Sequence, residues 1–60
     1  MKINCKDNVI EVEEGASGFD LAKKIGMGLY KAACAMRVNG EVRDLRTALA
    51  EGDVVEILTF

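Results

Sequence analysis

A single helix-like segment between short alternating segments is the feature that most restricts how this 60-residue chain can fold. Residues 17–20, Ser-Gly-Phe-Asp, have the spacing of a capping box, in which the serine oxygen accepts a hydrogen bond from the backbone of residue 20. Leu21, Ala22 and Ile25 then recur on one helical face, which predicts their burial. Gly26 follows where a left-handed helix end favours glycine. The pattern therefore predicts one short helix that begins after Ser17 and ends at Gly26.

Strands are expected on both sides of this helix. Apolar and polar residues alternate over residues 1–5, and residues 9–12 resume the pattern after a turn at 6–8, which predicts a hairpin. Asn39-Gly40 favours a type I′ turn, because both central residues of that turn need positive φ. The other segments follow in order: a helical turn at 29–33, strands at 34–38 and 41–43, a connection at 44–49 with Leu45 and Leu49 packed inward, a turn at 51–53 and a strand at 54–58.

The order strand, strand, helix, strand, strand, strand predicts an α+β domain of the β-grasp, or ubiquitin-like, class. A hairpin, a crossover helix and further strands give a mixed sheet with one main helix packed on one face. The last strand is apolar enough to lie in the middle of that sheet. A chain of this length is at most one domain, over residues 1–60, and it has little room for a deep active site.

Composition excludes several classes of function. Half of the residues are hydrophobic and 30% are charged, as in globular proteins, and the net charge of −2 provides no general attraction to nucleic acid or anionic membranes. No apolar run approaches the roughly 20 residues of a membrane span. The chain has no histidine and only one serine, so it contains no recognisable catalytic constellation. We expect neither catalysis nor a metal site.

The two cysteines, Cys5 and Cys34, lie far apart in the sequence and form no Cys-x-x-Cys pair. A secreted domain this small would carry several disulfides, so the pattern indicates a reducing, cytoplasmic setting. We expect both cysteines to be free, buried and packed as small apolar residues, with a single disulfide between them as the less favoured alternative.

The stretch KIGMGLYKAA, residues 24–33, raises the question of a phosphate-binding loop. Such loops lie before a helix, where the positive end of the helix dipole meets the phosphate. Here the predicted helix precedes Gly26 and Gly28, so the dipole at this end repels anions. The glycines are therefore interpreted as a helix end.

Four basic residues are candidates for contact with RNA: Lys23, Lys24, Lys31 and Arg37. If they gathered in one patch, they would attract a phosphate backbone on an otherwise acidic domain. The favoured alternative is a solvated surface with lysines placed by the helix dipole. Phe19 and Tyr30 are expected to complete the small core, with a partner surface as the alternative.

The chain resembles a TGS domain over nearly its whole length, in the stretches DLAKKIGMGLYKAACAMRVNGEVRDL and EGDVVEILTF. It is most similar to the N-terminal TGS domain of threonyl-tRNA synthetases, where an Ile-Gly-x-Gly-Leu-x-Lys-Ala run precedes an apolar strand and a Val-Asn-Gly turn. The residues that match are Ile25, Gly26, Gly28, Leu29, Lys31, Ala32, Val38, Asn39 and Gly40. Met27 departs from the pattern, because many synthetases have proline there.

The resemblance implies a non-catalytic accessory domain of a larger threonine–tRNA ligase, with no cofactor of its own. ATP, magnesium and zinc would bind to other domains of that ligase. The implied partners are those domains, with tRNA as a candidate and neither DNA nor membrane. One alternative is a ligand- or RNA-binding regulatory module of a (p)ppGpp synthetase/hydrolase or a GTPase. A less favoured one is a ubiquitin-like sulfur carrier without its Gly-Gly tail, since this sequence ends Leu58-Thr59-Phe60.

Overall fold

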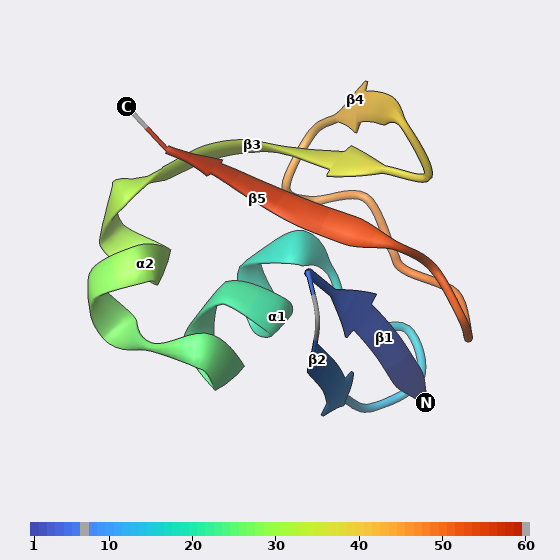
Figure 1. Ribbon diagram of the computed structural model, residues 1–60. Helices are drawn as coiled ribbons and strands as arrows, with labels where there is room; N and C mark the ends of the chain where they lie inside the picture. Colours follow the sequence, from blue (N-terminus) through green and yellow to red (C-terminus); the bar gives the residue numbers. More distant parts are fainter. Residues whose placement is uncertain (7, 60) are drawn as a thin grey trace.

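The computed structural model describes residues 1–6 and 8–59, so Asp7 of the predicted first turn and the final Phe60 lie outside the described residues. The described part contains five strands and two helices (Figure 1). In chain order they are β1 (Lys2–Cys5), β2 (Asn8–Glu11), α1 (Gly18–Ile25), α2 (Met27–Ala32), β3 (Ala33–Val38), β4 (Glu41–Arg43) and β5 (Val55–Thr59).

The strands form two small sheets that meet between β1 and β5. Strands β1 and β2 pair antiparallel, and a second antiparallel sheet has the order β4-β3-β5. A parallel bridge between Asn4 and Val54 joins the two sheets, supported by a 2.9 Å hydrogen bond from Asn4 N to Asp53 O. Strand β5 thus lies between β3 and β1. This arrangement confirms the predicted mixed sheet of the β-grasp class, with the last strand in its middle.

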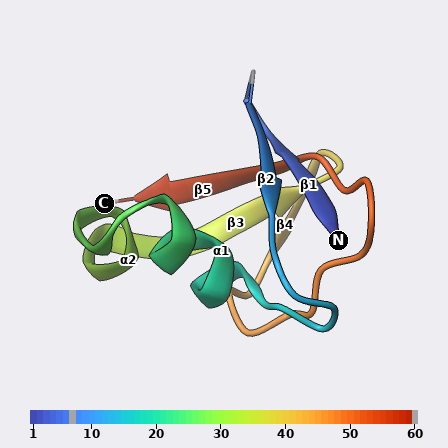
Figure 2. The same ribbon diagram turned by 90° about the horizontal axis from the view of Figure 1, so that it is seen from below.

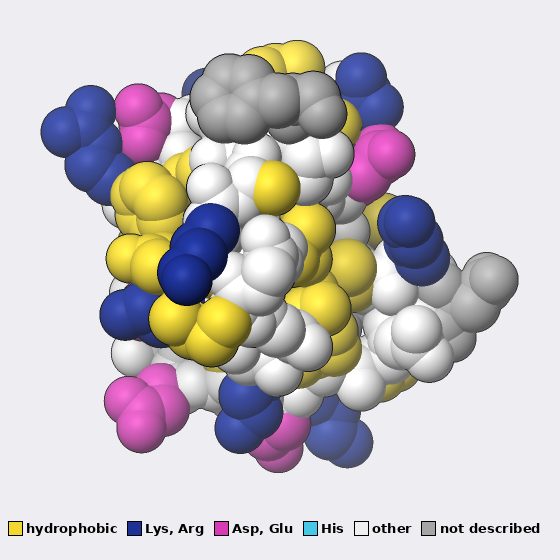
Figure 3. Space-filling model, turned by 90° about the vertical axis from the view of Figure 1, so that its left-hand side faces the viewer, with side chains coloured by type: hydrophobic (Ala, Val, Ile, Leu, Met, Phe, Trp, Pro, Cys, Tyr) yellow, Lys and Arg dark blue, Asp and Glu magenta, His cyan; other side chains and the backbone are white. Residues whose placement is uncertain are grey.

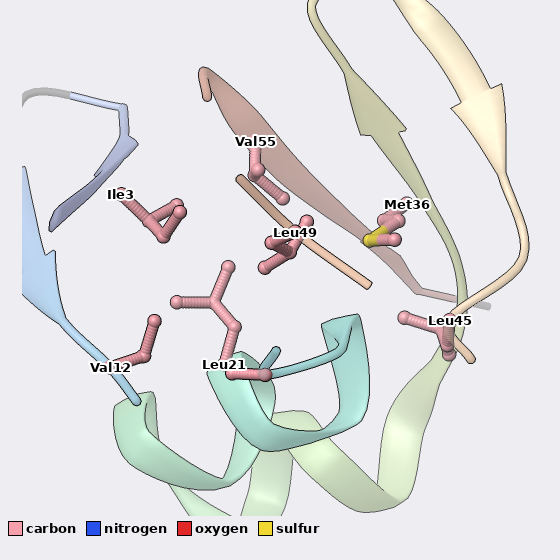
Figure 4. Close-up of a cluster of buried hydrophobic side chains, with 8 residues drawn as sticks. Ile3, Val12, Leu21, Met36, Leu45, Leu49 and Val55 are labelled. Atoms are coloured by element: carbon pink, nitrogen blue, oxygen red, sulfur yellow. The ribbon is translucent and has the colours of Figure 1, made fainter. Parts of the chain in front are cut away.

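Both helices lie on the same side of β3 and β5 (Figure 2). Between them and the strands lies a core formed by residues of β1, α1, β3, β5 and the connecting segments (Figure 4). Ile3, Leu21, Met36 and Val55 are its largest fully buried side chains, with at most 1% of their surface exposed. The inward packing predicted for the two leucines of the 44–49 connection is confirmed, since both are buried.

The start of α1 forms the predicted capping box. Ser17 Oγ accepts a hydrogen bond from Asp20 N at 3.5 Å, and Asp20 Oδ2 accepts one from Ser17 N at 2.9 Å. Two further backbone bonds, Phe19 N to Leu45 O at 3.2 Å and Leu49 N to Ala16 O at 2.8 Å, tie the connection to this turn. The helix start is therefore held both locally and by a segment distant in sequence.

The turn at Asn39-Gly40 is also as predicted, since φ is 51° at Asn39 and 88° at Gly40. The Asn39 side chain fixes the turn against the segment that leads into β5. It accepts a hydrogen bond from Val54 N at 2.9 Å and donates one to Asp53 Oδ1 at 3.1 Å. This residue therefore both favours the turn and joins it to the neighbouring strand.

The end of α1 differs from the prediction. Gly26 has φ 171° and ψ 149°, which is extended backbone, so the expected left-handed end is wrong. Gly26 N closes α1 on Ala22 O at 2.9 Å, and Gly26 O accepts from Tyr30 N at 3.0 Å as α2 begins. One extended residue therefore joins two helices. Ile25 lies at this joint, 42% exposed, and its predicted burial is wrong because the last turn of α1 extends past the core.

Candidate nucleic-acid interface

Three of the four RNA-contact candidates lie on the helices. Lys23 and Lys24 occupy the last turn of α1, and Lys31 the last turn of α2. All three side chains are exposed. Positive charge is favourable at the carbonyl end of a helix, so the helix dipole accounts for these positions without any ligand.

Lys23 is held by an aromatic pair. Its Nζ lies 4.9 Å from the centre of the Tyr30 ring, a distance at which the ring face attracts a cation. Tyr30 meets Phe19 edge to face, with ring centres 5.8 Å apart and planes at 71°. Phe19 packs against the core, which confirms its expected role, and both rings are half-buried. The pair links α1 to α2 and positions the ammonium group of Lys23 above it.

Lys24 lies in an acidic environment. It lines a hollow of 380 Å³ together with Glu13, Glu14 and Asp20. Carboxylates near a lysine weaken its attraction for a phosphate group, because the summed field decides binding. The carboxylates around Lys24 therefore reduce the positive potential at this position.

Arg37 lies on the opposite side of the sheet. Successive side chains of a strand point to opposite faces, and Met36 points into the core, so Arg37 points away from the helices. Its Nη1 lies 2.8 Å from Glu56 Oε1, and both side chains are about half exposed. The structure thus does not bring Arg37 together with the lysines.

Viewed from the side of α2, the basic side chains are spread over the surface with carboxylates among them (Figure 3). The four candidates therefore do not share one patch in the described part of the chain, since Arg37 lies on the other face of the sheet. None of the three lysines on the helices forms an ion pair with a described carboxylate, but Lys24 alone of them lines the acidic hollow.

Both cysteines are free, as expected, but neither is fully buried. Cys5 is half-buried, and this burial raises the pKa of its thiol above the usual value. Beside Cys5, Lys6 acts against this rise, but burial outweighs it. Cys34 is exposed, because it lies where the register between β3 and β5 shifts between Ala33 and Ala35. Its Sγ donates a hydrogen bond to Leu58 O at 3.5 Å.

The pKa of Asp44, which lies in a turn, is also shifted from its usual value. Asp44 accepts hydrogen bonds from the Arg46 side chain, at 3.2 Å from Nε, and from Arg46 N at 2.8 Å, and these bonds lower the pKa of the Asp44 carboxyl. Residues 1–6 and 8–59 contain no group of three or more metal-ligating side chains arranged to hold an ion. No helix among those residues is both long and apolar enough to cross a membrane.

A hollow of 170 Å³ that the sequence did not indicate lies between the first hairpin and the helix joint. Its apolar lining comes from Cys5, Ile10, Ile25, Leu29 and Ile57, which belong to separate elements. No local pattern connects these residues, so only the assembled fold places them together.

Comparison with known proteins agrees with the resemblance seen in the sequence. The TGS domain model matches residues 3–59. A threonine–tRNA ligase of Clostridium botulinum (strain Langeland) is 48% identical over a 61-residue alignment that covers the whole chain and 10% of the ligase. That of Clostridium tetani is 44% identical with the same coverage. That of Chlorobium phaeobacteroides is 45% identical over 51 residues, which are 85% of the chain and 8% of the ligase. The chain spans about a tenth of the length of the curated relatives it matches.

Proposed function

Because this chain belongs to the TGS domain family over residues 3–59, we propose that it is a non-catalytic accessory domain of a threonine–tRNA ligase. The similarity that carries this proposal extends over the whole chain, at 48% identity to the Clostridium botulinum ligase. The domain would stand at the N-terminal end of the longer polypeptide. It would act in the cytoplasm, where tRNA is charged with threonine.

The chemistry of the described residues is consistent with a non-catalytic domain whose ligase carries its catalytic groups elsewhere. Burial raises the pKa of the Cys5 thiol and so disfavours its reactive thiolate, and the lowered pKa of Asp44 has a local cause in its contact with Arg46. ATP, magnesium, zinc and threonine would therefore bind to other domains of the ligase. Those domains are the proposed partners of this one, and the domain itself would contribute binding and positioning.

For tRNA, we propose that contact is made through Lys31 and Lys23 on the helical side. Both ammonium groups are exposed at helix ends, and neither forms an ion pair with a described carboxylate. Lys24 lies among carboxylates, and Arg37 pairs with Glu56 on the other face, so these two candidates would contribute less.

A chimeric ligase tests the accessory role. In it, this chain replaces the matching segment of the Clostridium tetani enzyme, and a second protein lacks the segment altogether. We expect the chimera to charge tRNA with threonine more efficiently than the truncated enzyme. Equal rates in the chimera and the truncated enzyme would contradict the accessory role. Charging by the 60-residue chain alone would contradict its non-catalytic character.

Neutralising one cation at a time in the chimera tests the proposed tRNA contact. Lys31→Gln should weaken tRNA binding and lower the slope of log affinity against log salt by about one, the effect of losing one phosphate contact. Arg37→Gln is the matched control and should change neither quantity. Equal effects of the two substitutions would mean that the helical lysines have no special role.

A further inference from the structure

The hollow at the helix joint is an apolar groove open to solvent. We call it the joint groove; its lining comes from β1, β2, the two helices and β5, through Cys5, Ile10, Ile25, Leu29 and Ile57. Figure 3 shows a column of hydrophobic side chains along this side of the molecule. Ile25 is 42% exposed and the adjacent Met27 55% exposed. Contiguous exposed apolar surface of this kind marks interaction sites.

The charge at the groove restricts what can bind there. Lys6 is the only charged residue among its described lining residues, and no described carboxylate lines it. An occupant with an apolar side chain and a nearby carboxylate would match this lining. The volume of 170 Å³ is close to the roughly 150 Å³ of an apolar cavity that holds benzene, so one large side chain fills it.

The joint groove lies close to the end of β5, the last strand. Ile57 belongs to both β5 and the groove, and two residues later Thr59 pairs with Ala33 at the end of α2. Polypeptide that continues beyond β5 would start at the edge of the groove, which gives a following segment a high effective concentration there. About nine-tenths of the relatives' length lies outside the matched segment, and with the proposed N-terminal placement that polypeptide would follow β5.

We propose that the joint groove is the docking site for the segment that follows residue 60 in the longer ligase, through one large apolar side chain beside a carboxylate that faces Lys6. This inference rests on the proposed function, since it requires a longer polypeptide. It also explains why Ile25, in the motif that resembles synthetases, is exposed in the 60-residue chain.

The Cys5 thiol is a built-in probe of the groove, because it lines it and is half-buried. In a Cys34→Ser background, the alkylation rate of Cys5 is compared at one pH between the 60-residue chain and the Clostridium tetani chimera, after any other cysteines of the chimera are replaced or resolved by mass spectrometry. If the segment covers the groove nine-tenths of the time, alkylation slows roughly tenfold in the chimera, since only the open state reacts.

Two substitutions test whether the protection of Cys5 depends on the joint groove. In the chimera, Ile25→Gln should restore fast Cys5 alkylation, whereas Val42→Gln, on strand β4, which does not line the groove, should not. Both residues are exposed, so thermal melting of each variant should show a folded domain. Ile25→Ala serves as a second variant if the glutamine destabilises it.

Equal alkylation rates of Cys5 in the 60-residue chain and the chimera overturn the proposal. So does protection that appears in the 60-residue chain as its concentration rises, because a second copy would then be the occupant. Loss of charging with retained Cys5 protection would instead contradict only the accessory function.

Discussion

At the scale of single residues, Gly18 lies too close to Met36 and Leu45 to carry a side chain. It is buried as the first residue of α1. A Cβ at this position would lie 2.5 Å from Met36 Sδ, 3.0 Å from Leu45 Cδ2 and 3.1 Å from Leu45 O. The Met36 side chain is fully buried and has little room to move, and the Leu45 oxygen is part of the backbone. Glycine here lets the helix start approach the core and the connection at once.

Gly18→Ala should therefore destabilise the domain by about 1–3 kcal/mol, the usual cost of overpacking a core. Gly28→Ala is the matched control, because nothing lies within 4 Å of its added Cβ in α2. That second change should stabilise the domain by about 0.5–1 kcal/mol, since alanine loses less backbone entropy in a helix. Urea unfolding of both variants measures the difference. A Gly18→Ala variant at least as stable as the native chain would refute the close-approach interpretation.

At the scale of elements, α1 is short and depends on its first turn. A helix of eight residues gains little from propensity alone, so its end groups matter. The reciprocal bonds between Ser17 and Asp20 satisfy two backbone donors. The backbone bonds of the 44–49 connection to the same turn make the helix start a junction between distant segments.

Removing the cap tests this dependence. Ser17→Ala should lower the free energy of unfolding by about 1 kcal/mol, the typical value for loss of a serine cap. Thr47→Ala, an exposed change in the connection, should stay within about 0.5 kcal/mol of the native chain. Hydrogen exchange of the α1 amides should accelerate only in the first variant. Unchanged exchange in Ser17→Ala would show that tertiary contacts alone hold the helix.

At the scale of the whole molecule, one core joins the two small sheets to the helices. Ile3 comes from one sheet, Met36 and Val55 from the other, and Leu21 from α1 (Figure 4). A domain of this size has a single core that supplies only about 3–5 kcal/mol of stability. The loss of contacts in that core is therefore not compensated elsewhere. The molecule should therefore unfold as a single cooperative unit.

Two methionine truncations separate core from surface. Met36→Ala removes a fully buried side chain and should cost about 2–5 kcal/mol, which leaves the domain largely unfolded. Met27→Ala removes a side chain that is 55% exposed and should change the stability of the 60-residue chain by less than about 0.5 kcal/mol. The dispersion of amide proton NMR signals reports the outcome. A well-dispersed Met36→Ala spectrum would mean that the core tolerates a large cavity.

Features that depend on neighbouring residues could be predicted from the amino-acid order alone. The cap at Ser17 and the turn at Asn39-Gly40 are encoded within a few positions, so they were predicted correctly and set the order of the elements. The inward leucines of the 44–49 connection followed from their spacing. The family was recognisable for the same reason, because its motifs are contiguous in the sequence.

Which distant residues share a surface followed from the packing of the folded chain. The alternation of β3 puts Arg37 on the face away from the lysines, and the hollow beside α1 puts Lys24 among carboxylates. The extended conformation of Gly26 allows a second helix to begin at once, which leaves Ile25 in an open groove beside Ile57. These outcomes depend on contacts between segments far apart in the chain, and no short-range pattern records such contacts.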